Sequence, residues 1–251
     1  MFKRFGFSGA YDISRTEDQV FSVGYSVDTN FINQVEGFDV VDQFAYLNYS
    51  KRLLPDLTGS VLLSDQYTIV DDDRFRNEIA IRPTLAYRLR DNIVVEGAYR
   101  FATSNYFRDT AAVNDRDANT HTVSATGSFL MPDYDILFTA GYVHSWINAD
   151  GANFEAQSDS VRLGVRASLP WQVTAEASVS RTWDDYDNPN TLSLTGEVRD
   201  DITNRFTARL TRPVTQNVSA YLNFTRTDKD SNISFFEYDQ DRWEAGLTVS
   251  F

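Results

Sequence analysis

The last nine residues of the chain, Trp243–Phe251, alternate between apolar side chains at odd positions and small or polar ones at even positions. Successive side chains of a β-strand point to opposite sides, so this pattern predicts a strand with two different faces. The apolar series ends on Phe251, with no polar tail behind it. A soluble sheet would bury such a face, and an edge strand of a soluble sandwich is the alternative interpretation.

The same alternation recurs along the whole chain at intervals of about 20 residues. Thirteen segments show it: residues 3–14, 19–30, 40–53, 58–69, 77–90, 93–106, 119–131, 136–147, 159–169, 173–184, 190–212, 216–227 and 238–251. Short connections rich in Asp and Pro join alternate segments, at 15–18, 54–56, 91–92, 132–135, 170–172 and 213–216. Long acidic connections join the others, near 31–39, 70–76, 107–118, 148–158, 185–190 and 228–237. Segment 190–212 is unusually long, so we expect it to project beyond a membrane or to contain a bulge.

The composition further narrows the possible fold and function classes. The 251 residues are 42% hydrophobic, but no apolar run approaches the ~20 residues that a membrane helix needs. Aromatic residues make up 14% of the chain, which suits the interfacial girdles of a membrane barrel. The absence of cysteine excludes disulfides and thiolate metal sites, and the net charge of −13 argues against nucleic acid as a partner. Residues 1–6 lack the apolar core of a secretory signal, so we expect a signal that has been removed or a start that is truncated.

The polar face separates a soluble sheet from a membrane barrel. It carries isolated Arg and Glu among Ser, Thr and Gly, with few Lys, which suits a confined aqueous lumen better than a freely solvated surface. We therefore predict an all-β fold: a transmembrane antiparallel up-and-down β-barrel of 12–14 strands, one domain over residues 1–251, with short periplasmic turns and longer acidic extracellular loops. Bacterial barrels have even strand numbers, so thirteen segments leave three solutions open. These are a fourteen-stranded parent shortened at its start, a twelve-stranded barrel with residues 1–14 elsewhere, or one misassigned segment.

The C-terminal hairpin resembles known families. The resemblance rests on Thr225–Ile233, Tyr238–Arg242, Gly246–Leu247 and the terminal Phe251, and in style on Asn105–Asp109 and Asp185–Asp187. It is similar to the outer-membrane β-barrel porin family of the exopolysaccharide-locus type, and to the barrel of surface lipoprotein assembly modifiers. Assembly modifiers carry a periplasmic helical-repeat domain before the barrel, a segment that we do not expect within these 251 residues. The resemblance implies an outer-membrane barrel and supplies no catalytic or binding residue.

Candidate lumen-lining residues follow from the polar face. They are Arg82, Arg88, Arg100, Arg162, Arg166, Arg205, Arg209, Glu78, Glu96, Glu176 and Glu244. The arginines could form a basic ladder that selects anionic or sugar solutes, because guanidinium groups stay ionised and make bidentate contacts. Alternatively, they pair with the glutamates on neighbouring strands and fill the interior.

The sequence gives weaker support for metal binding and for catalysis. The Asp-rich loops lack the spacing of a calcium loop, so we expect a solvated surface and no metal or other cofactor, with divalent bridges to lipopolysaccharide as a variant. His121 and His144 lie far apart in the sequence, and neither His144 nor the pair Asp184–Asp185 has the surrounding groups that a lipase or protease requires. We therefore expect no enzymatic activity.

The sequence thus predicts a passive channel or export conduit in the bacterial outer membrane, carrying polar solutes and, by resemblance, polysaccharide. A structural or assembly barrel with a plugged lumen, whose loops bind a partner, is the alternative, and an outer-membrane hydrolase is a third class. Expected partners are outer-membrane lipid and lipopolysaccharide, a polysaccharide, and the barrel-assembly machinery through Phe251.

Overall fold

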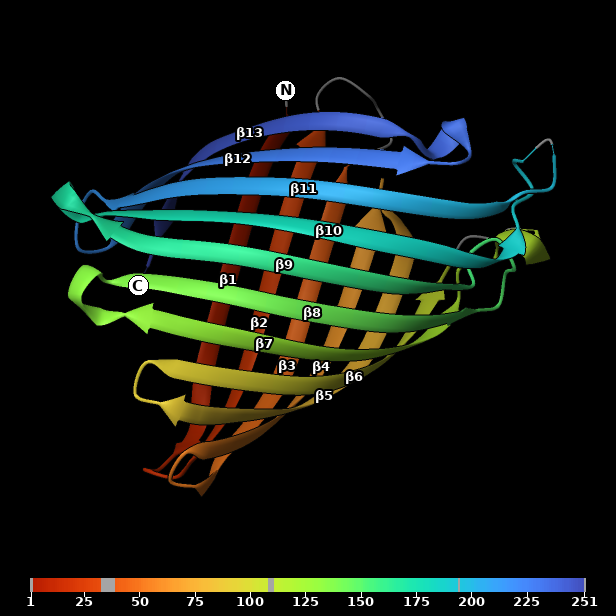
Figure 1. The fold of residues 1–251 in the computed structure, drawn as a ribbon. Helices are drawn as coiled ribbons and strands as arrows, with labels where there is room; N and C mark the ends of the chain where they lie inside the picture. The colour runs from red at the N-terminus through yellow and green to blue at the C-terminus, as the bar shows by residue number, and fades with distance from the viewer. Residues whose placement is uncertain (1, 33–38, 108–110, 194, 251) are drawn as a thin grey trace. The chain divides into compact units, whose positions relative to one another are not determined.

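Thirteen strands follow one another in chain order in one antiparallel, up-and-down sheet (Figure 1). The computed structural model describes residues 2–32, 39–107, 111–193 and 195–250. The strands are β1 (Phe2–Arg15), β2 (Gln19–Ile32), β3 (Val40–Leu54), β4 (Leu57–Val70), β5 (Asp73–Arg90), β6 (Ile93–Tyr106), β7 (Ala118–Met131), β8 (Ile136–Ala149), β9 (Ala156–Leu169), β10 (Val173–Pro189), β11 (Val198–Pro213), β12 (Val218–Ser231) and β13 (Tyr238–Val249). Four single-turn 3₁₀ segments lie between strands: η1 (Ala112–Asn114), η2 (Pro132–Tyr134), η3 (Pro170–Gln172) and η4 (Ser234–Phe236). No helix among these residues has the length and apolar character needed to span a membrane.

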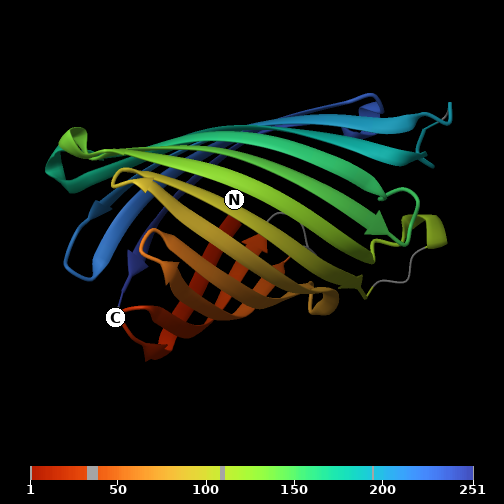
Figure 2. The ribbon, with the colours of Figure 1, turned by 60° about the horizontal axis from the view of Figure 1, so that its bottom comes forward.

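The chain divides into two compact units, which are described separately. The first unit contains residues 1–87, 97–123 and 145–156, and the second contains residues 88–96, 124–144 and 157–251. Strands β1 to β4, coloured red to orange in Figure 2, run side by side in the first unit. In the second unit β10 pairs with β11, β11 with β12 and β12 with β13, without an interruption in register from Asp201 onward.

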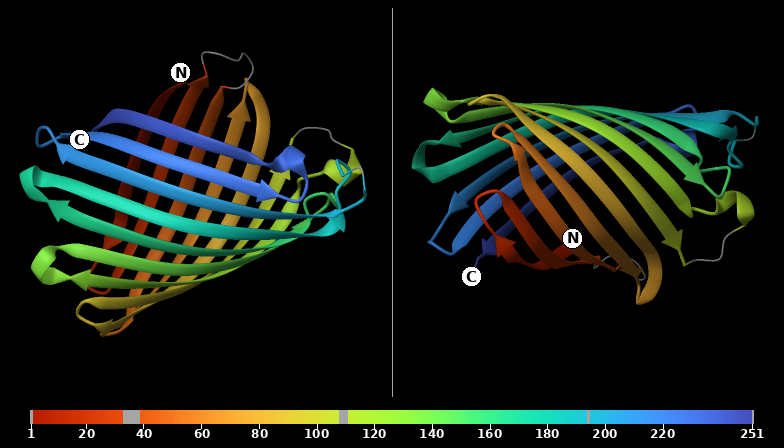
Figure 3. Two further views of the ribbon diagram at one scale, coloured as in Figure 1. Left: turned by 45° about the horizontal axis from the view of Figure 1, so that its top comes forward. Right: turned by 90° about the horizontal axis from the view of Figure 1, so that it is seen from below.

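The predicted difference between the two ends of the strands is confirmed in the second unit. Strands β9 and β10 are joined by η3, and β11 and β12 by residues 214–217. At the opposite end, β10 and β11 are joined by residues 190–197, and β12 and β13 by residues 232–237 (Figure 3). Pro170 and Pro213 accompany the short turns, because proline ends a strand and favours a turn.

The predictions for one connection and for the start of one strand are wrong. A long loop was expected near residues 70–76, but β4 and β5 are joined by Asp71 and Asp72 alone. Both residues have left-handed backbone conformations, with φ of 54° and 64°, which aspartate tolerates better than most residues. The predicted segment 190–212 also begins too early, because β10 extends to Pro189 and β11 starts only at Val198. Phe251 and parts of the connections 31–39 and 107–118, Asp109 included, lie outside the described residues.

The sheet has an exposed apolar face in place of a packed hydrophobic core. The side chains of Leu163, Trp243 and Leu247 are 59%, 64% and 68% exposed. Within the described part of the chain, the buried hydrophobic residues are limited to three alanines and Ile233. A soluble sheet would instead cover this face.

Candidate functional site

In the second unit, cross-strand pairing gathers the predicted charged residues on one face. One row across β10, β11, β12 and β13 consists of Glu176, Arg209, Asn223 and Glu244. A second row consists of Ser180, Arg205, Thr227 and Gln240. Residues that pair across neighbouring strands point to the same side, so these side chains share a face, here named the polar face.

Strand β9 contributes two further arginines to the polar face. The Nη2 of Arg162 donates a hydrogen bond to Ser178 Oγ at 3.1 Å, and Arg166 Nε lies 3.7 Å from Glu176 Oε1. Both contacts join β9 to β10 on the side where Glu176 points. The structure therefore brings together six predicted residues: Arg162, Arg166, Glu176, Arg205, Arg209 and Glu244.

Glu244 is held by a residue that the sequence analysis did not select. Arg242 Nη2 lies 2.5 Å from Glu244 Oε1, and Asn223 Nδ2 donates to Glu244 Oε2 at 3.0 Å. Arg242 and Glu244 are two residues apart on one strand, so the strand period of two places both on the polar face. That spacing was the signal that could have identified Arg242.

Three arginines of the polar face have no carboxylate partner among the described residues. Arg162 bonds only to the hydroxyl of Ser178, and Arg209 Nε donates to Thr211 Oγ1 at 3.3 Å. Within the described chain, Arg205 forms neither an ion pair nor a side-chain hydrogen bond. Because a guanidinium group stays ionised at neutral pH, the polar face of this unit carries more positive than negative charge.

Arg209 also stacks on the ring of Tyr221. Its guanidinium carbon lies 4.4 Å from the ring centroid of Tyr221, and the Tyr221 ring lies against Gly246 on β13. A Cβ on Gly246 would approach the Tyr221 hydroxyl oxygen to 2.6 Å, so glycine leaves the room that the ring occupies. The stack orients Arg209 over the sheet.

The remaining predicted residues are distributed over both units. In the first unit Glu78 Oε1 lies 2.5 Å from Arg100 Nη2, and Glu78 Oε2 accepts a hydrogen bond from Ser104 Oγ at 2.9 Å. Arg82 is in the row of Ser22, Asn48 and Leu62 on the same face as Glu78. Arg88 is exposed near the end of β5 and Glu96 is half-buried on β6, both in the second unit. Of the pairs between arginines and glutamates that the alternative interpretation proposed, the structure contains Arg100 with Glu78 and Arg166 with Glu176.

A buried ionic cluster lies at the long-connection end of β11 and β12. Asp201 is fully buried, its Oδ2 is 2.5 Å from Arg199 Nη2 and 2.7 Å from Lys229 Nζ, and Arg199 lies over the Phe236 ring at 3.4 Å. Burial acts to raise the pKa of Asp201, but hydrogen bonds from Arg199, Lys229 and Ser231 outweigh it, so the pKa lies below its ordinary value. The sequence analysis missed this cluster, because 28 residues separate Asp201 from Lys229 and only the hairpin register joins them.

Three carboxylates of the Asp-rich connections lie close together. The carboxylates of Asp115, Asp117 and Asp150 approach within 4.8 Å of one another. Two of them accept backbone hydrogen bonds, Asp117 from the Tyr106 amide at 2.6 Å and Asp115 from the Asp117 amide at 3.0 Å. These bonds hold Asp115 and Asp117 in place directly before β7.

One histidine contacts a tyrosine hydroxyl, and the other contacts an aspartate that also accepts a hydrogen bond from a tyrosine. His121 Nδ1 lies 2.6 Å from the hydroxyl of Tyr99 in the first unit. In the second unit, His144 Nδ1 lies 2.8 Å from Asp159 Oδ1, which also accepts a hydrogen bond from Tyr142. Asp159 shares the parity of the apolar positions on β9, so this group lies on the face opposite the arginines.

Comparison with known proteins identifies the family. The family model described as surface lipoprotein assembly modifier matches residues 14–251. The chain belongs to this family. No curated protein matches this chain by sequence.

Solved structures support the fold alone. OccD3 (OpdP) of Pseudomonas aeruginosa and a variant of OccD1 (OprD) are similar to this chain, each with a TM-score of 0.50 and 11% sequence identity. The similarity covers 95% and 97% of the chain. The chain spans 66% of the OccD3 chain, just under two thirds, and 88% of the OccD1 chain. The all-β antiparallel fold is therefore similar to outer-membrane porin barrels, and the family and fold together imply a bacterial outer membrane.

Proposed function

We propose that this protein is a non-catalytic outer-membrane channel that passes polar solutes or an exported polymer along its polar face. The observation that carries the proposal is the division of the second unit into an exposed apolar face and a polar face with unpaired arginines. An apolar face such as that of Leu163 and Trp243 is stable against hydrocarbon, which leaves the polar face toward water. Polysaccharide as the cargo rests on the family resemblance of the C-terminal hairpin.

The paired and the unpaired residues of the polar face would have different roles in such a channel. The pairs of Arg242 with Glu244 and of Arg166 with Glu176 cross-link neighbouring positions of the wall. Arg205 has no partner among the described residues and Arg162 has only a hydroxyl, so both guanidinium groups can contact a passing anion or sugar hydroxyl. Weak contacts at several successive arginines permit passage without trapping the solute.

Planar-bilayer recording tests the channel. We expect stepwise currents from the refolded protein, with a preference for anions. In Arg205→Glu combined with Arg209→Glu, this preference should fall or invert, because two positive charges on the polar face become negative. Arg226→Glu is the matched control, since Arg226 is in the row of Phe206 on the opposite face and should leave selectivity unchanged. Absence of any current from folded protein would refute the channel.

The family description favours a second candidate function, a scaffold with a plugged interior whose loops bind a surface lipoprotein during its assembly. Under this alternative the bilayer recordings are silent, while cells lacking the protein lose lipoprotein from the cell surface. Surface labelling of an epitope-tagged lipoprotein in cells with and without the gene measures this. Current together with normal lipoprotein display favours the channel, and silence together with lost display favours the scaffold.

A further inference from the structure

On the apolar face of the second unit, apolar side chains are replaced by charged ones at one level along the strands. A row that runs through Val179 and Phe206 continues into Arg226 on β12 and Asp241 on β13. The next row toward the long connections consists of Arg181, Asn204, Asp228 and Asp239. Below these rows, toward the short turns, the same face of β12 carries Val218, Ala220, Leu222 and Phe224. Two arginines therefore mark the upper edge of the apolar surface.

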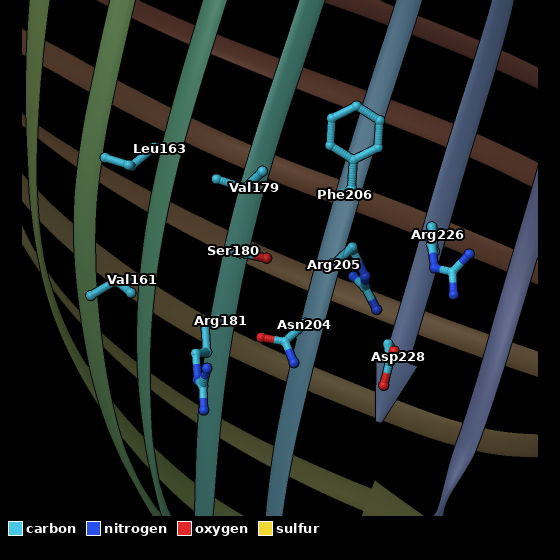
Figure 4. A pocket seen from close by; sticks show the side chains of 10 residues that line it. All are labelled: Val161, Leu163, Val179, Ser180, Arg181, Asn204, Arg205, Phe206, Arg226 and Asp228. Carbon is cyan, nitrogen blue, oxygen red and sulfur yellow. The ribbon is translucent and has the colours of Figure 1, made fainter. Parts of the chain in front are cut away.

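A groove of about 420 Å³ lies across this edge (Figure 4). Val161 and Leu163 on β9, Val179 on β10 and Phe206 on β11 form its apolar part. Figure 4 shows Arg181 and Asn204 on one side of the Val179–Phe206 row, and Arg226 beside Phe206 on the next strand. The groove is thus amphipathic: its apolar walls lead to the cationic side chains of Arg181 and Arg226. Ser180, Arg205 and the acidic residue Asp228 also line it.

The two arginines at the groove are weakly engaged. Arg226 Nη1 is 3.9 Å from Asp241 Oδ2, and both side chains are more than half exposed, at 54% and 53%. Arg181 rests beside the Trp183 ring, with 5.3 Å from its guanidinium carbon to the ring centroid, and has no carboxylate partner in the described part of the chain. An exposed ion pair at such a distance contributes little to stability, so both guanidinium groups remain available to an anion.

The level of the arginines matches a membrane boundary. Arg226 follows Val218 by eight residues on β12. At about 3.3 Å per residue this is roughly 26 Å along the strand, or about 20 Å in height at a tilt of ~40°, comparable with the apolar band of about 25 Å on outer-membrane barrels. In such barrels the long connections face the exterior, which places the arginines at the outer leaflet.

We propose that this groove binds one molecule of lipid A, the phosphorylated glycolipid of the outer leaflet. An acyl chain lies along Val161, Leu163 and Phe206, and a phosphate group contacts Arg181 and Arg226. Arginine matches a phosphate because its planar guanidinium group donates two parallel hydrogen bonds. An acylated lipoprotein has the hydrocarbon chains but no phosphate, so the two arginines favour the glycolipid. The site lies on the apolar face and is independent of the channel.

Native mass spectrometry of the folded protein in detergent, titrated with lipid A in the presence of EDTA, tests the proposal. EDTA removes divalent cations that could hold a phosphate on Asp241 or its neighbours. An interfacial arginine contributes a factor of about five to the binding of an anionic lipid, so Arg181→Gln with Arg226→Gln should weaken binding roughly thirtyfold. Arg209→Gln is the matched control, because Arg209 is on the polar face and does not line the groove, and this variant should bind as the unaltered protein does. Heat-modifiable migration verifies that each variant is folded.

A gain of affinity provides a second test that misfolding cannot imitate. Asp241→Asn removes the carboxylate that competes for Arg226, so lipid A should bind a few times more tightly. Lipid A without its phosphates should bind the unaltered protein as weakly as the double arginine variant binds lipid A. The proposal fails if the double variant retains full affinity or if Arg209→Gln loses as much. It also fails if a diacylglyceryl lipopeptide binds as tightly as lipid A and is insensitive to the arginine substitutions, which would assign the groove to an acylated protein.

Discussion

At the residue scale, Asp201 shows how this sheet accommodates a buried charge. Its carboxylate is fully inaccessible, yet Arg199 donates to both oxygens, at 3.0 and 2.5 Å, and Lys229 approaches at 2.7 Å. Two cations and several hydrogen bonds replace the hydration that the carboxylate loses on burial. Arg199 in turn lies against the rings of Phe236 in η4 and Tyr186 in β10, so the cluster joins η4 to the end of β10.

We expect Asp201→Asn to lower the free energy of unfolding by about 3–5 kcal/mol, because it leaves the buried Arg199 and the half-buried Lys229 without their counter-charge. Urea titration of the protein folded in vesicles measures the loss. The exposed carboxylate of Asp241 gives the control, and Asp241→Asn should change stability by less than about 1 kcal/mol. Equal losses in the two variants would show that burial of Asp201 does not matter.

The lowered pKa of Asp201 also predicts an acid dependence. The ionised carboxylate contributes its full stabilisation above the unfolded pKa of about 3.9. As pH falls through the lower folded-state pKa, the proton is bound and the contribution disappears. The unaltered protein should therefore lose its stability advantage over Asp201→Asn between about pH 4 and the acid limit, and urea midpoints measured across that range check this. A difference that is constant with pH would contradict it.

At the element scale, two tight turns place pairs of residues in the left-handed region. Asp71 and Asp72 have φ of 54° and 64°, and Trp171 and Gln172 have φ of 63° and 60°. Consecutive left-handed residues match the right-handed twist of a hairpin, but only glycine adopts them without steric cost. Aspartate tolerates this region because its short side chain can bond to nearby backbone, whereas tryptophan and glutamine have no such compensation.

Glycine at these turns should therefore stabilise them unequally. We expect Gln172→Gly to raise the free energy of unfolding by about 1 kcal/mol, and Asp72→Gly to raise it by less, roughly 0.5 kcal/mol or below. Urea midpoints of the two variants, refolded under identical conditions, give the comparison. A larger gain at residue 72 than at residue 172 would show that the aspartate is the more strained of the two.

The elements themselves could be predicted from side-chain periodicity, and the errors have physical causes. The strand period of two placed Arg205 and Arg209 on one face correctly, since every residue of a strand follows it. It failed at the start of β11, because Leu192 and Val198 keep the even parity of the strand although Leu192 lies in the connection. It could not find the groove arginines, because Arg181 and Arg226 occupy apolar-face positions and their significance depends on the level at which neighbouring strands align.

At the scale of the whole molecule, the apolar side chains are distributed between exposed and buried positions differently from those of a soluble sheet. Large apolar side chains such as Leu163 and Leu247 are mostly exposed, and the buried hydrophobic residues within the described chain are few and mainly alanine. Stability therefore cannot come from a packed interior. It requires hydrocarbon against the apolar face and closed backbone hydrogen bonding between strands, which is what a bilayer imposes on a spanning sheet.

Two adjacent positions on β12 test this difference between the faces at one depth. Leu222 pairs with Leu210 on the apolar face, and Asn223 pairs with Glu244 on the polar face. In lipid vesicles, Leu222→Arg should lower the free energy of unfolding by about 2–4 kcal/mol, because the cation faces hydrocarbon near the middle of the apolar span. Asn223→Arg should cost less than about 1 kcal/mol, since the Glu244 carboxylate that now accepts from Asn223 at 3.0 Å can accept from the new cation. Equal costs, or a larger cost at position 223, would mean that the apolar face does not meet lipid, and the lipid A site would lose its basis as well.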